Sequence, residues 1–143
     1  MEFDTAILIP AGVLILWTMG VLIAMMVQRM RIFSQMKVDL GTSPPGKRGI
    51  DLERENPEIR DWAAHNYMHL MEQPTIFYAA SALLAFGGYT GYDLVLCWLY
   101  VAIRMVHSVW QIRVNKVQPR AMIFLASSAV MLLIAVRALL SVL

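Results

Sequence analysis

Apolar residues along the chain gather into four long blocks, and polar residues gather mainly into one stretch between the first block and the second. The blocks fall at about 6–27, 62–86, 93–114 and 119–140. Each is long enough to cross a bilayer as a helix, since roughly 20 apolar residues span the hydrocarbon core. The pattern predicts an all-α integral membrane protein in which a single domain, 1–143, forms a bundle of four transmembrane helices.

Local signals refine the ends and contacts of these helices. Asn56-Pro57-Glu58 has the order of a cap, a proline and an acid in the first turn, which predicts that the helix entering the second block begins there. Residues 29–37 would extend the first helix beyond the membrane. Gly12 and Gly20 would allow another helix to approach closely. Arg137, near the end of the fourth block, would extend outward to the membrane surface.

The overall composition supports a membrane protein. The chain is 59% hydrophobic and 15% charged, whereas soluble domains are about 45–50% apolar and about 25% charged. The formal net charge of +2 is small, so we expect no nucleic-acid partner. The single cysteine, Cys97, excludes an internal disulfide and any metal cluster held by cysteines.

Positive charge is concentrated in two of the three connections. The stretch 28–61 carries seven Lys and Arg residues, and the short turn after the third block is flanked by three more: Arg113, Lys116 and Arg120. The turn at 87–92 carries none. Because four spans would put the first and third connections on the same side, the positive-inside rule places both in the cytoplasm and both termini outside.

The second and third blocks carry polar side chains where apolar ones would be expected. In the second block they share overlapping faces of one helix: His65, Asn66, His69, Glu72 and Gln73. In the third block they recur at i, i+3 and i+7: Arg104, His107 and Gln111. A charged side chain inside a bilayer is costly, and it is kept when it is paired, hydrated or functional.

Counting residues from the cytoplasmic boundary brings these groups to matching depths. Glu72 lies roughly 16 Å and Arg104 roughly 15 Å from that boundary at 1.5 Å per residue. The tight turn at 87–92 makes the two blocks antiparallel neighbours, so we expect Glu72 and Arg104 to form an ion pair. His69 and His107 match each other at roughly 10–12 Å.

The polar groups would line a pocket that opens toward the cytoplasm, with Arg29 or Arg31 and Arg120 at its rim. Such a pocket suits a small anionic, peptide-like ligand from the cytoplasm and a lipophilic partner from the membrane. The alternative is a purely structural cluster, in which an ion pair and interhelical hydrogen bonds fix the packing of the helices.

A metal site is a further alternative of a different class. In the second block, His65 and His69 stand at i and i+4, and Glu72 follows three residues later. Together with His107 on the third helix, these side chains would suit zinc or iron. The guanidinium of Arg104 nearby would repel a cation.

Two stretches together resemble one known family. They are Asn66-Tyr-Met-His-Leu-Met-Glu-Gln-Pro-Thr-Ile-Phe-Tyr78 and Arg104-Met-Val-His-Ser-Val-Trp-Gln-Ile-Arg-Val-Asn-Lys-Val-Gln-Pro-Arg120. With the four blocks and the long charged first connection, they resemble a bacterial branch of the MAPEG family, the membrane-associated proteins of eicosanoid and glutathione metabolism. The resemblance covers nearly the whole chain.

The resemblance implies a homotrimer of four-helix bundles in a bacterial inner membrane, with glutathione bound between neighbouring subunits near the cytoplasmic face. Membrane lipid and a lipophilic small molecule would be the other partners. Family activities include conjugation of glutathione to lipophilic electrophiles and reduction of lipid hydroperoxides. We therefore expect a membrane-bound, glutathione-dependent transferase or peroxidase.

The motif match also assigns roles to residues. Arg120 would favour the glutathione thiolate as the catalytic cation, and His107 would orient or donate a proton. Glu72 and Arg104 would hold the tripeptide. The remaining candidates for the glutathione pocket are polar neighbours on the same helices and the basic end of the first helix: His69, Asn66, His65, Arg31, Arg29 and Gln111.

The chain departs from the family pattern at three of these positions. Family enzymes show Arg-x-x-x-Asn-x-x-Glu in the second helix, and here His65 and His69 stand at the first two of those positions. Gln111 stands where a tyrosine is often found. A second function is therefore open: a non-catalytic lipid- or small-ligand-binding membrane protein on the same scaffold.

Overall fold

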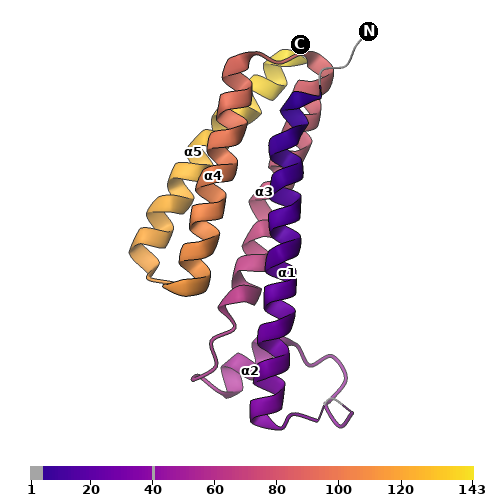
Figure 1. The fold of residues 1–143 in the computed structure, drawn as a ribbon, viewed down its shortest axis with the longest axis vertical. Coiled ribbons are helices and arrows are strands. Elements are labelled where there is room, and N and C mark those ends of the chain that lie inside the picture. Colours follow the sequence, from indigo (N-terminus) through magenta and orange to yellow (C-terminus); the bar gives the residue numbers. More distant parts are fainter. Residues whose placement is uncertain (1–4, 40) are drawn as a thin grey trace.

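The fold is a bundle of four long helices with one short helix at one end (Figure 1). The computed structural model describes residues 5–39 and 41–143; residues 1–4, part of the N-terminal tail expected outside the membrane, and Leu40 in the first connection lie outside the described residues. The elements are η1 (Ala6–Leu8), α1 (Ile9–Met36), α2 (Gly49–Glu55), α3 (Trp62–Gly87), α4 (Gly91–Arg113) and α5 (Val117–Ser141). The predicted all-α class is confirmed.

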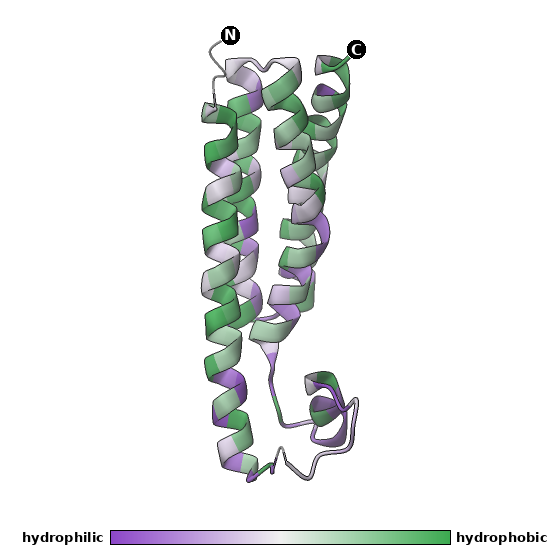
Figure 2. Cartoon of the chain, turned by 90° about the vertical axis from the view of Figure 1, so that its right-hand side faces the viewer, coloured by the Kyte–Doolittle hydropathy of each residue, from purple (hydrophilic) through white to green (hydrophobic). Residues whose placement is uncertain are grey.

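The two basic connections lie toward one end of the bundle, and η1 and the C-terminus lie at the other (Figure 1). Helix α1 packs along α3, and α4 packs along α5, while α3 also contacts α4 and α5. Figure 2 shows that hydrophobic residues cover most of the length of the four long helices, whereas α2 and its flanking segments are more hydrophilic. This distribution is the one expected when a bundle is embedded in lipid and its connection is in water.

Among the described residues, three helices are long and apolar enough to cross a membrane, judged by length and composition: Ala6–Met36, Gly91–Arg113 and Val117–Ser141. Helix α3 is not one of them, although its 26 residues would rise about 39 Å. The reason is its polar cluster, since Glu72 and Gln73 interrupt every long apolar window of this helix. The structure therefore supports a multi-pass membrane protein with three apolar spans.

The buried core runs along the axis of the bundle between all four long helices. Its largest apolar members come from each of them and are almost completely buried: Leu14, Leu70, Phe77, Tyr100 and Ile134. Large apolar side chains are also exposed on the outer faces of the bundle, among them Leu16, Phe86 and Leu125. Those outer faces are suited to lipid rather than to water.

Two of the predicted helix ends can be compared with the structure. The extension of the first helix over residues 29–37 is confirmed, because α1 continues to Met36. The predicted start at Asn56 is wrong: α3 begins at Trp62. The Asn56 side chain instead donates to the carbonyl oxygen of Leu52 (3.0 Å), so this amide closes α2 rather than opening α3.

Within this chain, no other helix packs closely against Gly12 or Gly20. A Cβ atom built at either glycine would meet no heavy atom within 4 Å, because both face the outside of the bundle. Close approach occurs at Gly87 instead, where the backbone of Ser141 occupies the space that a Cβ would need. The end of α3 and the end of α5 therefore meet backbone to backbone.

The structure gives Arg137, whose side chain is 38% exposed, a partner that the sequence did not indicate. Its guanidinium pairs with both carboxylate oxygens of Asp93, Nε to Oδ1 at 2.7 Å and Nη2 to Oδ2 at 3.0 Å. Asp93 is 1% exposed and also accepts from the backbone N–H (2.8 Å) and hydroxyl (2.7 Å) of Thr90. The pair joins α4 to α5. A buried carboxylate without a cationic partner would strongly destabilise the fold, so the guanidinium stays paired with it.

Candidate functional site

A fully buried arginine, Arg104 of α4, lies at the centre of the candidate site. Its Nη2 donates to the carbonyl oxygen of His69 on α3 at 2.7 Å. Its Nε and Nη1 are buried and have no hydrogen-bond partner within the described residues. The guanidinium carbon also lies 5.8 Å from the centre of the Phe124 ring of α5. A buried cation with two unused donors is an unsatisfied group that favours an anionic partner.

The predicted ion pair between Arg104 and Glu72 is not formed. The Glu72 side chain is 67% exposed, and its Oε2 lies 3.4 Å from Nδ1 of His69 on the same helix. Counting residues along the helices places Glu72 and Arg104 at matching depths, but the Glu72 side chain does not point toward Arg104. Asn66 marks the buried face of α3, and a residue six positions later is turned about 120° away from it at 3.6 residues per turn. Glu72 therefore points to the outside of the bundle.

A small cavity lies beside Arg104. It has a volume of about 170 Å³ and is lined by His69, His107, Arg120, Ala121 and Phe124. The His69 and His107 rings are 6.0 Å apart between centroids, which confirms that these two residues lie at one depth. The structure thus brings together three of the predicted site residues from three different helices.

Arg120 is held at the rim of this cavity by the turn between α4 and α5. Its Nη1 donates to Oδ1 of Asn115 at 2.6 Å, which uses one of its five donors. The other candidate catalytic residue, His107, is 2% exposed. Both therefore line the cavity in positions from which they could contact a bound anion.

Asn66 and Gln111, two predicted pocket residues, belong to a hydrogen-bonded chain instead. Trp17 Nε1 donates to Ser108 Oγ (3.0 Å), Ser108 Oγ donates to Asn66 Oδ1 (2.5 Å), and Asn66 Nδ2 donates to Gln111 Oε1 (3.1 Å). This chain links α1, α3 and α4. Sequence reasoning missed Trp17 and Ser108, and no spacing in the sequence singles them out. These are interhelical hydrogen bonds of the kind that the structural alternative predicts, while Nε2 of Gln111 is buried without a hydrogen-bond partner in the described residues.

A second polar contact crosses α3, α4 and α5. Gln73 donates through Nε2 to Ser128 Oγ at 2.9 Å. Its Oε1 accepts from the Tyr100 hydroxyl at 3.3 Å and from Ser127 Oγ at 3.5 Å. These contacts fix α5, and with it Phe124 and Arg120, against the helices that carry Arg104 and His69.

The remaining candidates lie at the polar end of the bundle. Arg29 pairs through Nε with Asp61 Oδ2 at 2.9 Å, and its guanidinium passes directly over Gly49 of α2. His65 faces Glu53 of α2, with Nε2 and Oε2 2.8 Å apart. Arg29 and His65 border a polar cavity of about 510 Å³ between α1, α2 and α3. Arg31, by contrast, is exposed on the outer side of α1.

The structure gives no support to the metal alternative. Within residues 5–39 and 41–143, no three His, Cys, Asp or Glu side chains lie close enough to hold one ion. His65 is turned toward Glu53, away from the pair formed by His69 and His107.

The comparison with protein families decides the classification. The MAPEG family model matches residues 7–140, which include all four long helices and the site described above. The chain belongs to the MAPEG family. No curated protein and no solved structure matches it. The family membership therefore rests on the whole length of the chain, and the resemblance found in the sequence is confirmed.

Proposed function

We propose that this MAPEG protein is a membrane-bound, glutathione-dependent transferase or peroxidase acting on lipophilic electrophiles or lipid hydroperoxides. Its main support is Arg104, a buried cation with two unpartnered donors that touches two residues lining the cavity, His69 and Phe124. A buried charge without a partner costs several kcal/mol. An anionic ligand group in or beside the cavity would remove that cost.

Each residue would then have a separate task. Bound glutathione supplies the sulfur nucleophile, whose thiol is mostly protonated in neutral water. Arg120 and Arg104 would stabilise negative charge in the cavity through charge-assisted hydrogen bonds. His107 would hold a proton for the leaving group of an electrophile or for the oxygen released from a hydroperoxide. No protein nucleophile is needed.

We further propose that α3 is the fourth membrane span and that the chain works as a homotrimer. The support is Glu72 of α3. Its carboxylate is exposed on the outer surface of the bundle, which is mostly apolar along the long helices. Such a group is costly against lipid. A neighbouring subunit that covers this face, with an amine of glutathione between the two subunits, would supply a partner. The two basic connections would then face the cytoplasm.

One observation favours the second candidate function, non-catalytic binding of a lipid or small ligand. His65 stands where family enzymes have an arginine, and here it contacts Glu53 of α2 rather than the cavity. A site with one cation fewer would hold glutathione without activating its thiol as strongly. Binding without turnover is the signature of this alternative.

The deciding experiment is calorimetric titration of glutathione into the detergent-purified protein and into Arg104→Met. Replacing a buried, partly unsatisfied cation with an apolar side chain of similar length should leave the bundle folded, and we expect glutathione binding to be lost. Lys116→Ala is the matched control, because Lys116 is exposed on the same turn as Arg120. Unchanged binding by Arg104→Met would contradict the proposal. A parallel assay with a lipophilic aryl halide separates turnover from binding alone.

A further inference from the structure

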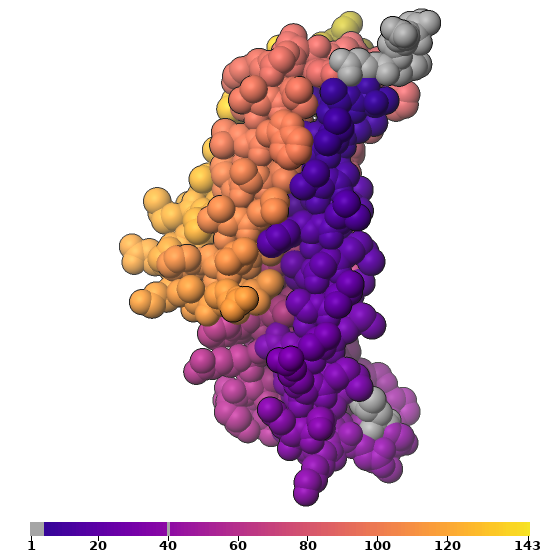
Figure 3. Space-filling model, in the orientation of Figure 1, coloured from indigo at the N-terminus to yellow at the C-terminus, as the bar shows by residue number. Residues whose placement is uncertain are grey.

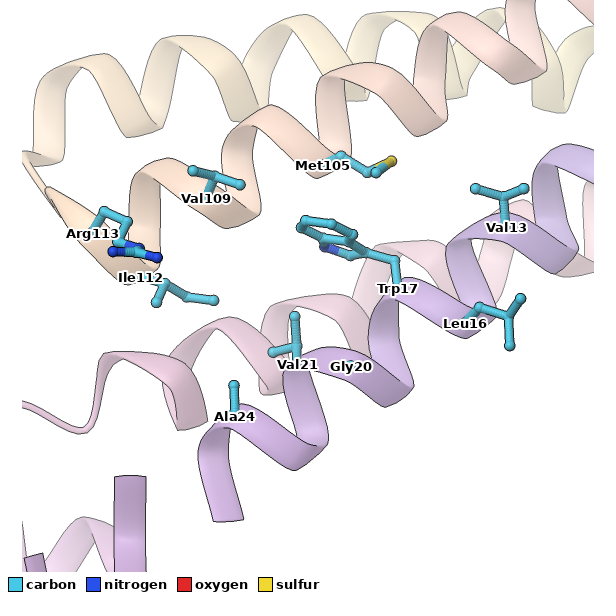
Figure 4. Close-up of a pocket in the computed structure, with 10 residues that line it drawn as sticks. All are labelled: Val13, Leu16, Trp17, Gly20, Val21, Ala24, Met105, Val109, Ile112 and Arg113. Carbon is cyan, nitrogen blue, oxygen red and sulfur yellow. The ribbon is translucent and has the colours of Figure 1, made fainter. Parts of the chain in front are cut away.

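An apolar groove on the outer surface lies between α1 and α4, which run side by side (Figure 3). Its volume is about 620 Å³, within the range of pockets that hold small molecules. Figure 4 labels the residues of the two helices that line it: Val13, Leu16, Trp17, Gly20, Val21, Ala24, Met105, Val109, Ile112 and Arg113. The groove is separate from the cavity beside Arg104, with which it shares no lining residue.

Trp17 forms a fixed wall of this groove. Its ring lies between the two helices (Figure 4), and its Nε1 is held by Ser108 of α4 at 3.0 Å. The gap beside it exists because Gly20 and Ala24, one and two turns further along α1, have almost no side chain. The sequence thus places a large side chain and two small ones on one face, which keeps the groove open.

Arg113 is the one charged residue in the lining of the groove, and it lies at the end near Ala24 (Figure 4). It is exposed, and within the described part of the chain it has no ion pair. An apolar groove that ends in a free guanidinium is complementary to a molecule with a long apolar chain and an anionic head.

We propose that the groove binds a long-chain fatty acid, with its hydrocarbon chain along α1 and α4 and its carboxylate on Arg113. From Val13 to Ala24 the groove extends about 16 Å along α1 at 1.5 Å per residue, which covers most of the length of one extended long acyl chain. A planar carboxylate can accept two parallel hydrogen bonds from a guanidinium. This site goes beyond the glutathione-dependent function and does not rest on it.

The test is quenching of tryptophan fluorescence by a fatty acid brominated on its chain, added to the protein in lipid nanodiscs. Bromine quenches only nearby rings, so a ligand in the groove should quench Trp17, and Trp17→Phe should remove the saturable part of the signal. A phosphatidylglycerol brominated on its chains serves as the comparison at the same acyl concentration. We expect saturable quenching by the fatty acid and only weak, non-saturable quenching by the phospholipid.

The two glycines of α1 provide a matched pair of variants. A Cβ at Gly20 or Gly12 would meet no heavy atom within 4 Å, so leucine fits at both, but only Gly20 lines the groove. Gly20→Leu should abolish the saturable quenching, whereas Gly12→Leu should leave it unchanged. Arg113→Gln should raise the half-saturating concentration of the fatty acid by roughly tenfold or more, the value of a charge-assisted hydrogen bond.

Three outcomes would overturn the proposal. Equal quenching by the phospholipid would show that the groove is an ordinary lipid-facing surface. Unchanged saturable binding in Gly20→Leu or in Arg113→Gln would show that the fatty acid binds elsewhere or without the carboxylate contact. A smaller particle for Gly20→Leu than for Gly12→Leu in light scattering would show that a second copy of the chain covers the groove.

Discussion

At the scale of single residues, the interior of this bundle is organised by side chains that need partners. Asn66 is fully buried and satisfies both its oxygen and its nitrogen across the α3–α4 contact. Arg104 is equally buried but leaves two donors unused. Because an unpaired buried polar group is expensive, the first residue fixes the packing, and the second is the residue on which the proposed ligand site rests.

Replacing Asn66 with alanine should lower the free energy of unfolding by about 1–3 kcal/mol, because Ser108 and Gln111 would lose their buried partner. Unfolding in mixed detergent micelles, followed by circular dichroism, measures this change. Gln118→Ala, at an exposed position of α5, should have little effect. Equal stability of the two variants would show that the chain from Trp17 to Gln111 does not hold the helices together.

Arg120→Ala should reduce the rate of glutathione conjugation by about tenfold or more while the protein remains folded, because a cationic donor at the cavity contributes on the order of 1.5–3 kcal/mol. Steady-state kinetics with the lipophilic aryl halide measures the rate, and native mass spectrometry measures the assembly. A variant with unchanged turnover would remove Arg120 from the catalytic role.

At the scale of helices, the end of the bundle near the termini is held by two contacts. One is the pair of Asp93 and Arg137, which joins α4 to α5. The other is the backbone approach of Gly87 to Ser141, which joins α3 to α5. Helix α5 is thereby anchored at the end opposite the cavity, so that Arg120 and Phe124 at its beginning are positioned by the whole helix.

The pair of Asp93 and Arg137 should behave as a unit. Arg137→Leu leaves a buried carboxylate without its cation and should lower the melting temperature clearly, whereas Asp93→Asn combined with Arg137→Leu should recover part of the loss. Thermal unfolding of the single and double variants measures the coupling. If the double variant melts below both single variants, the two residues do not compensate each other.

Gly87→Ala should destabilise the bundle by about 1–3 kcal/mol, because a Cβ there collides with the backbone of Ser141 and the two helix ends must separate. Gly91→Ala is the control, since a Cβ at the start of α4 meets no heavy atom within 4 Å. The same micelle unfolding assay compares the two. Loss of stability in both variants to the same degree would point to backbone freedom rather than close packing.

At the scale of the whole molecule, charge separates the two ends of the bundle. The end of α1, the first connection with α2 and the turn between α4 and α5 carry most of the basic residues, whereas η1 and the C-terminus lie opposite (Figure 1). The positive-inside rule therefore gives the molecule one orientation. In that proposed orientation, the turn that holds Arg120 would face the cytoplasm.

Labelling of single introduced cysteines should confirm this orientation. Thr42→Cys lies in the exposed first connection and Tyr92→Cys at the opposite end of the bundle, while the native Cys97 is buried and should stay silent. A membrane-impermeant maleimide should label Thr42→Cys only in inside-out vesicles and Tyr92→Cys only in right-side-out vesicles. The reverse result would invert the topology.

The sequence by itself determined the helices, their order and the end at which positive charge collects, because length, hydropathy and charge are local properties of the chain. It also brought His69 and His107 to one depth, since the rise per residue of a helix is fixed. What only the tertiary structure decided is how each helix is rotated about its axis. The polar residues of α3 spread over overlapping faces and do not reveal which face is buried, and for this reason the predicted inward position of Glu72 is wrong. The partners of Arg104, Asp93 and Asn66 depend on that rotation, and so does the groove beside Trp17.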